Sequence, residues 1–217
     1  MENPCIRFHL KFAMVRCTDP NPANTRATLL LRLRLNTPAR EIAWREFHDL
    51  YSPVIVAFAR RMGARPQDIA DVLQDVLMGF FAVAPAFMYD PTKGRFRGYL
   101  KTCTWRVFQK RLGKNLRLDG RSLEQVDPSE VHVEAAWNDV WEREKLHRAL
   151  QVIRDRYLAQ PSKAKTFLAF EMYVLLERDA ESVACELDMS VDSVHQAKVR
   201  VSQALRVEAN AIDQSVA

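Results

Sequence analysis

Glycine and cysteine are scarce in this chain, and neither forms a recognisable motif. Its 217 residues include 6 Gly, with no phosphate-binding loop and no G-x-G-x-x-G fingerprint. The 4 Cys contain no C-x-x-C pair, which argues against a zinc knuckle or a disulfide framework and favours a reducing cytoplasm. The 5 His do not cluster and no H-E-x-x-H occurs, so the sequence predicts no catalytic residue, no metal site and no cofactor.

Long apolar runs are also missing. The longest stretch without a charge runs from Val76 to Tyr89 and falls short of the about 20 apolar residues that a membrane span requires. Arg7, Lys11 and Arg16 interrupt any apolar segment at the start, which is unlike a secretory leader. We therefore expect a cytoplasmic protein without membrane insertion.

Charge is distributed unevenly along the chain. Ten of its 32 Lys and Arg lie between Lys93 and Arg121, together with a single acid. The preceding segment, residues 66–92, has four aspartates and no Lys or Arg. Adjacent blocks of opposite sign indicate two different partners, one of them polyanionic. The alternative is an acidic helix that simply pairs with a basic one.

Hydrophobic residues recur at three- and four-residue intervals, and strand-type alternation is nowhere convincing. We predict an all-α fold of two small helical domains joined by a flexible linker. The expected organisation is an irregular N-terminal arm at 1–24, a helical bundle at 25–117, a linker at 118–133 and a second helical domain at 134–217. Within the bundle, a helix should break near Asn36 to Pro38, another should begin at Pro66, and the last should end around Gly113.

The helix predicted from Pro66 has an acidic face. Asp68, Asp71 and Asp75 share one side of it, opposite the apolar residues. Like charges at these spacings disfavour a helix, and no Lys or Arg at i+4 relieves them. A basic partner would explain this face; a solvated helix surface is the alternative.

The next helix mixes cations with aromatic rings, of which Trp105 and Phe108 lie off its apolar face. Cations follow phosphates, and aromatic rings stack on unpaired bases for about 1–3 kcal/mol each. The composition is typical of single-strand binding. Packing of both rings beneath another helix is the alternative.

Residues 180–187, 188–190 and 191–206 have the spacing of a helix-turn-helix. Ser190 is a fair N-cap for the second helix. The side chains predicted to face inward are Val194, Ala197, Val201 and Leu205, and those predicted to face outward are Asp192, Ser193, Gln196, Val199, Arg200 and Gln203, with Lys198 on a flank. Such an outward row suits base edges in a major groove, whereas a plain helical hairpin is the alternative.

Together these segments resemble the bacterial extracytoplasmic-function sigma factors, especially their planctomycete-like branch. The matching phrases are Thr25 to Leu33, Ala43 to Phe47, Asp68 to Val76, Tyr89 to Pro91 with Gly94 to Leu100, and Ser190 to Val194 with Ala197 to Val201. The resemblance implies that the first domain docks on core RNA polymerase and melts the minus-10 promoter element. It implies that the second reads the minus-35 element, with an anti-sigma factor as a further partner.

The resemblance also assigns residues to these roles. The polymerase-contacting positions are Asp68, Asp71, Gln74 and Asp75. The minus-10 positions are Arg95, Arg97, Tyr99, Lys101, Trp105, Arg106 and Lys110. The minus-35 positions are Ser193, Gln196, Lys198 and Arg200, with Lys198 expected on phosphate rather than on a base. The family prefers Gly in the turn where Asp188 stands; aspartate adopts the left-handed conformation at some cost.

Three other functions compete with this hypothesis. A stand-alone helix-turn-helix regulator would explain residues 157–206 and leave the acidic face without a purpose. An adaptor that binds polymerase without reading promoters is the second. A di-metal carboxylate enzyme is the third, but Glu144 to His147 is a single E-x-x-H, where that chemistry requires two. We therefore expect a protein that is not an enzyme.

Overall fold

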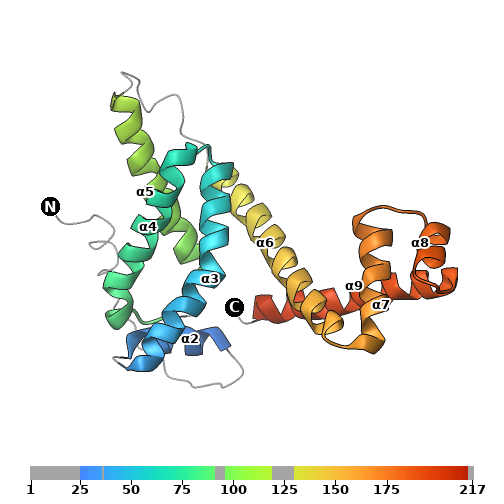
Figure 1. Ribbon diagram of the computed structural model, residues 1–217. Coiled ribbons are helices and arrows are strands. Elements are labelled where there is room, and N and C mark those ends of the chain that lie inside the picture. Colours follow the sequence, from blue (N-terminus) through green and yellow to red (C-terminus); the bar gives the residue numbers. More distant parts are fainter. Residues whose placement is uncertain (1–24, 36, 91–95, 119–129, 215–217) are drawn as a thin grey trace. The chain divides into compact units, whose positions relative to one another are not determined.

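The computed structural model describes residues 25–35, 37–90, 96–118 and 130–214 (Figure 1). The fold is all-α, as predicted, and no strand occurs within those ranges. The helices are α2 (Thr25–Arg34), α3 (Pro38–Arg61), α4 (Pro66–Val83), the 3-10 turn η1 (Ala84–Ala86), α5 (Phe96–Leu118), α6 (Glu130–Leu158), α7 (Pro161–Phe170), the π-helical segment η4 (Glu171–Leu175), α8 (Ala180–Glu186) and α9 (Val191–Gln214). The predicted N-terminal arm and Arg95 lie outside the described residues.

Two prolines lie at the start of a helix, as predicted. Pro38 and Pro66 each occupy the first turn of a helix, where the absent backbone N–H leaves no hydrogen bond unmade. Two other boundaries differ from the prediction. Helix α5 continues past Gly113 to Leu118, and α6 begins at Glu130, inside the predicted linker. Gly113 is buried, and packing there outweighs the about 1 kcal/mol that glycine costs a helix.

The chain divides into two compact units, the first extending to Glu142 and the second from Arg143 to Gln214. The division falls within α6, later than the predicted linker. Residues of the first half of α6 are buried in the core of the first unit; they are Val133, Ala136, Trp137, Val140 and Trp141. Two buried indoles cost about 3–5 kcal/mol each on truncation, so this half of α6 is a fixed part of the first unit.

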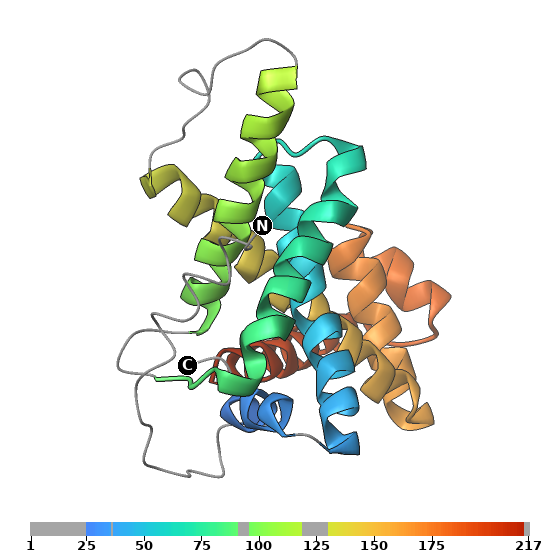
Figure 2. The same ribbon diagram turned by 90° about the vertical axis from the view of Figure 1, so that its left-hand side faces the viewer.

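An aromatic cluster forms the core of the first unit. The rings of Phe47 and Phe80 stack with centroids 4.8 Å apart, and Phe96 meets Phe80 at 5.4 Å. On the side of α6, Trp137 lies edge-on to Phe58 at 5.0 Å. Figures 1 and 2 show α4 and α5 side by side, with α3 against α4. This packing brings the acidic and the basic segments of the sequence together.

The second unit contains the second half of α6, α7, η4, α8 and α9. One core cluster joins α6, α7 and α9 through Ile153, Phe167 and Val201. Another holds α8 against α9 through Val183 and Val194. The fully buried side chains of these two clusters fix the rotation of α9 about its axis. They thereby decide which residues of α9 face outward.

Candidate functional site

Helix α4 presents an acidic face, which we define as Asp68, Asp71, Gln74 and Asp75. The opposite face of the helix is apolar and includes the buried Val72, Val76 and Phe80. Asp71 and Gln74 are exposed, whereas Asp68 and Asp75 are half-buried. Asp68 lies in the first turn, where a negative charge is favoured by the helix dipole. The amphipathic pattern of the sequence therefore places the acidic face as predicted.

A cation from another helix offsets the like charges of this face, contrary to the expectation from sequence. Arg111 of α5 donates from Nε and Nη2 to Oδ2 of Asp75 at 2.9 and 2.7 Å. It also donates from Nη1 to Oδ2 of Asp71 at 2.9 Å. The helix spacing rules consider only neighbours three or four residues away. Arg111, in contrast, lies 36 residues from Asp75 and 40 residues from Asp71 along the chain. Both aspartate side chains remain about half exposed, at 55% and 46%.

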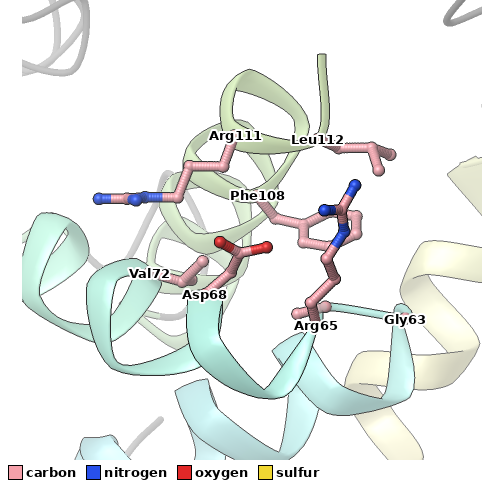
Figure 3. Close-up of a pocket in the computed structure, with 8 residues that line it drawn as sticks. Gly63, Arg65, Asp68, Val72, Phe108, Arg111 and Leu112 are labelled. Atoms are coloured by element: carbon pink, nitrogen blue, oxygen red, sulfur yellow. The ribbon is translucent and has the colours of Figure 1, made fainter. Parts of the chain in front are cut away.

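A small pocket of about 50 Å³ lies where the α3–α4 turn meets α5 (Figure 3). Its lining residues are Gly63, Ala64, Arg65, Asp68, Val72, Phe108, Arg111 and Leu112. The Arg111 guanidinium points out of the pocket, toward its partners Asp71 and Asp75. Gly63 has a φ of +88°, so the turn that forms one wall relies on glycine.

Helix α5 carries its predicted minus-10 residues on two different sides. On one side, the Arg97 guanidinium lies 5.8 Å from the centre of the Trp141 ring, and Lys101 forms an ion pair with Glu134. Both partners belong to the first half of α6. Arg106 and Lys110 lie elsewhere on the helix and are exposed.

The aromatic residues of α5 differ in accessibility. Phe108 is buried, with 4% of its surface exposed, which favours the packing alternative for this ring: it packs beneath the α3–α4 turn. Trp105 is half-buried and stacks on Phe108, with ring centroids 5.5 Å apart and planes at 27°. Tyr99 is half-buried and packs on Phe87 at 5.0 Å. Of the two rings that the sequence placed off the apolar face, Trp105 alone is not fully buried, and it packs against the core of the first unit.

The helix, turn, helix segment of the second unit has the predicted local geometry. The backbone N–H of Ser193 donates to Oγ of Ser190 at 3.1 Å, which makes Ser190 the N-cap of α9. Asp188 has a φ of +49°, the left-handed conformation expected from the family's preference for Gly. The Met189 N–H donates to the Ala184 carbonyl at 3.0 Å and closes the end of α8. The segment is compatible with a helix-turn-helix.

The inward and outward faces of α9 match the prediction. Val194, Ala197, Val201 and Leu205 are all buried. The predicted minus-35 residues Gln196, Lys198 and Arg200 are exposed, and Ser193 is half-buried. Arg200 donates from Nη2 to Oε1 of Gln196 at 3.2 Å, so these two side chains adjoin on the outward face.

One aromatic neighbour of α9, Tyr173, was missed by the sequence analysis and makes two contacts with that helix. The Lys198 ammonium lies 5.5 Å from the centre of the Tyr173 ring, which comes from η4. The same ring meets His195 edge-on at 5.4 Å. Tyr173 thus holds the flanking cation beside the outward row, at a distance typical of a cation–π contact. No short-range pattern links η4 to α9.

Within the described ranges, no group of three or more His, Cys, Asp or Glu side chains could hold a metal ion. The segment Pro66–Ala86 is long and apolar enough to cross a membrane by length and composition. However, Asp71 and Asp75 of this segment pair with Arg111, and its Phe80 belongs to the core. The core helix of a soluble protein has the same composition, so this segment is weak evidence for a membrane span.

Comparison with known proteins adds one finding. Residues 47–117 match the family described as Sigma-70 region 2. The match begins within α3 and includes all of α4 and nearly all of α5, and thus both the acidic face and the basic helix. No curated protein matches the chain. The likeness of residues 47–117 to Sigma-70 region 2 supports a member of the sigma factor family, whose proteins are non-enzymatic factors of transcription initiation.

Proposed function

We propose that this protein is a sigma factor of the extracytoplasmic-function type, which directs core RNA polymerase to specific promoters. The observation that carries the proposal is the joint placement of the acidic face and the basic α5 within the segment that matches Sigma-70 region 2. In the proposal, the acidic face docks on a basic surface of the polymerase. Helix α5 then contacts the minus-10 element as the two DNA strands separate.

The second unit reads the minus-35 element in this proposal. Its support is the buried inner row of α9, which leaves Gln196 and Arg200 outward on a capped helix. Glutamine and arginine make bidentate hydrogen bonds to adenine and guanine edges in the major groove. Ser193 joins this row, and Lys198 serves a phosphate. The protein works in the cytoplasm, without a catalytic residue, and an anti-sigma factor that covers either surface would regulate it.

Reconstitution with bacterial core RNA polymerase tests the proposal. The full chain should co-elute with the core enzyme, and the complex should select DNA fragments that share two elements at a fixed spacing. A stand-alone regulator would behave differently: it would bind duplex DNA without the core enzyme and leave the core enzyme unbound. That second pattern would contradict the proposal.

A further inference from the structure

Tyr173 lies in a widened helical turn of the second unit. In η4, the backbone N–H of Leu176 donates to the carbonyl of Glu171, five residues back, at 3.0 Å, as in a π-helix. A π-helical turn contains an extra residue, so its side chains are rotated relative to those of a continuing α-helix. Single turns of this kind frequently occur at functional sites. The turn is thus a candidate functional feature, and Tyr173 is its central residue.

The ring of Tyr173 joins the core of the second unit to two exposed side chains of α9. Tyr173 is half-buried and packs against the core cluster that contains Val183 and Val194. Its ring meets His195 edge-on with centroids 5.4 Å apart, and the Lys198 ammonium lies 5.5 Å from the ring centre. His195 and Lys198 are three residues apart and therefore share one stripe of α9. Both are exposed, so the ring gives an exposed cation a fixed neighbour.

This stripe is a flank of α9 and differs from its outward row. On a helix of 3.6 residues per turn, Arg200 lies roughly 200° around the axis from Lys198. A helix of about 10–12 Å diameter fills a major groove of about 12 Å width, so the flanks of an inserted helix face the two sugar–phosphate backbones. With Gln196 and Arg200 toward the base edges, Lys198 faces the backbone on the side of η4.

A ring is a suitable support for a lysine that binds phosphate. Immobilising a flexible side chain at an interface opposes binding, and a cation–π contact restricts the Lys198 ammonium before DNA arrives. An acidic neighbour would also hold the ammonium, but it would cancel the charge that a phosphate recognises. The ring of Tyr173 holds the ammonium and leaves its positive charge intact.

We propose that Tyr173 is a positioning residue for DNA binding, whose ring holds the Lys198 ammonium in place for one backbone phosphate of the minus-35 duplex. The inference rests on the proposed function, because it adds a residue of η4 to the surface by which the second unit binds the promoter. It assigns a role to the π-helical turn, which lies outside the family match of residues 47–117.

The test is a double-mutant cycle between Tyr173 and Lys198, measured as the affinity of the holoenzyme for duplex promoter DNA before strand separation, over a range of salt concentrations. Lys198→Gln should lower the slope of log affinity against log salt by about 0.9, the value for one lost phosphate contact. Tyr173→Leu should weaken binding roughly 2- to 5-fold, which corresponds to about 0.5–1 kcal/mol for an exposed cation–π contact. Added to Lys198→Gln, it should cause no further loss.

Two ring variants separate the ring face from the hydroxyl group and from packing. Tyr173→Phe keeps the ring face and should bind like the wild type. Pentafluorophenylalanine at position 173 keeps a ring of similar shape, but its fluorine atoms withdraw electron density from the face that attracts the ammonium. It should bind as weakly as Tyr173→Leu, and it takes the place of that variant in the cycle if Tyr173→Leu fails to fold.

Tyr157→Leu is the matched control, because Tyr157 is also half-buried in the second unit but packs on Phe167. It should lower the thermal stability of the protein and leave the affinity of the folded holoenzyme unchanged.

Five results would overturn the inference. They are an unchanged salt slope in Lys198→Gln, additive losses in the double variant, wild-type affinity of the fluorinated variant, and a loss in Tyr173→Phe or in Tyr157→Leu equal to that in Tyr173→Leu. A wild-type chain that forms no holoenzyme, or a holoenzyme that does not distinguish minus-35 sequences, would instead overturn the proposed function.

Discussion

At the scale of single residues, Arg111 shows how one guanidinium can pair with two carboxylates of the acidic face. Its contacts with Asp71 and Asp75 are partly exposed, with 27% of the Arg111 side chain accessible. Such pairs stabilise a fold by about 0.2–1 kcal/mol each. These ion pairs contribute little free energy to the free protein. A basic partner can therefore compete with Arg111 for the same carboxylates.

The first prediction concerns this face. Replacing Asp71 and Asp75 together with Ala should weaken binding to core RNA polymerase, by about 2–5 kcal/mol if the pairs become desolvated in the complex. Arg111→Ala is the matched control, because it breaks the same intramolecular contacts and leaves both carboxylates in place. It should bind the core enzyme at least as tightly as the wild type.

Titration of labelled protein with core enzyme at low and physiological salt measures both affinities. Wild-type affinity of the double aspartate variant under both conditions would contradict the role of the acidic face. An equal loss in Arg111→Ala would show that the α4–α5 packing matters rather than the carboxylates.

The second prediction concerns Arg200 and Lys198. Arg200 adjoins Gln196 on the outward row, whereas Lys198 lies against Tyr173 on the flank. Arg200→Ala should cost roughly 1–3 kcal/mol and relax the base preference at one position. Lys198→Ala should weaken binding to all sequences alike. Binding of the two variant holoenzymes to a library of minus-35 sequences distinguishes these patterns.

If Lys198→Ala changes the base preference and Arg200→Ala does not, the orientation assigned to α9 in the groove is wrong.

At the scale of elements, the turn between α8 and α9 carries a local strain. Asp188 has a φ of +49°, where a residue other than glycine loses roughly 1–2 kcal/mol. The adjoining N-cap, Ser190, offsets part of this cost through its hydrogen bond to Ser193. The turn therefore forms despite an unfavourable residue.

The third prediction follows from that strain. Asp188→Gly should stabilise α9 by up to about 1 kcal/mol, because glycine adopts this conformation without a Cβ clash. Asp192→Gly is the control, since it introduces the same residue into the first turn of α9 and should destabilise the helix by about 0.5–1 kcal/mol. Amide hydrogen exchange of α9 in the full chain measures both changes. Slower exchange in Asp192→Gly than in Asp188→Gly would contradict this account of the turn.

The sequence predicted most elements because their signals are local. Proline at first turns, the Ser190 cap and three- and four-residue periodicity depend on neighbours along the chain. The structure departs from the sequence-based expectations, or decides between their alternatives, where residues distant in the chain make the contacts. Gly113 continues a helix because it is buried there. Phe108 is buried by the α3–α4 turn, which no helical wheel of α5 contains.

The candidate site shows the same division. The acidic face and the outward row of α9 follow from periodicity, and the structure places them as expected. The partners Arg111, Trp141 and Tyr173 come from other helices and could not be predicted from spacing. Contacts with these partners determine how the side chains of the predicted binding residues are held at the surface.

At the scale of the whole molecule, the two charge blocks of the sequence meet in one unit but do not neutralise each other. Arg111 links the basic block to Asp71 and Asp75, which agrees in part with the alternative of two helices that pair. Arg106 and Lys110 remain exposed on α5, and Asp71 and Gln74 remain exposed on α4. The first unit therefore presents an acidic surface and a basic surface, as a protein that bridges a polymerase and DNA requires.

The measurement that tests the central claim most directly is permanganate footprinting of a promoter selected by the reconstituted holoenzyme. Core polymerase with the wild-type chain should make thymines near the minus-10 element reactive, because the strands there are unpaired. Neither component alone should do so. Promoter thymines that stay unreactive with both components present, while the chain alone protects a duplex site, would contradict the account and favour a stand-alone regulator.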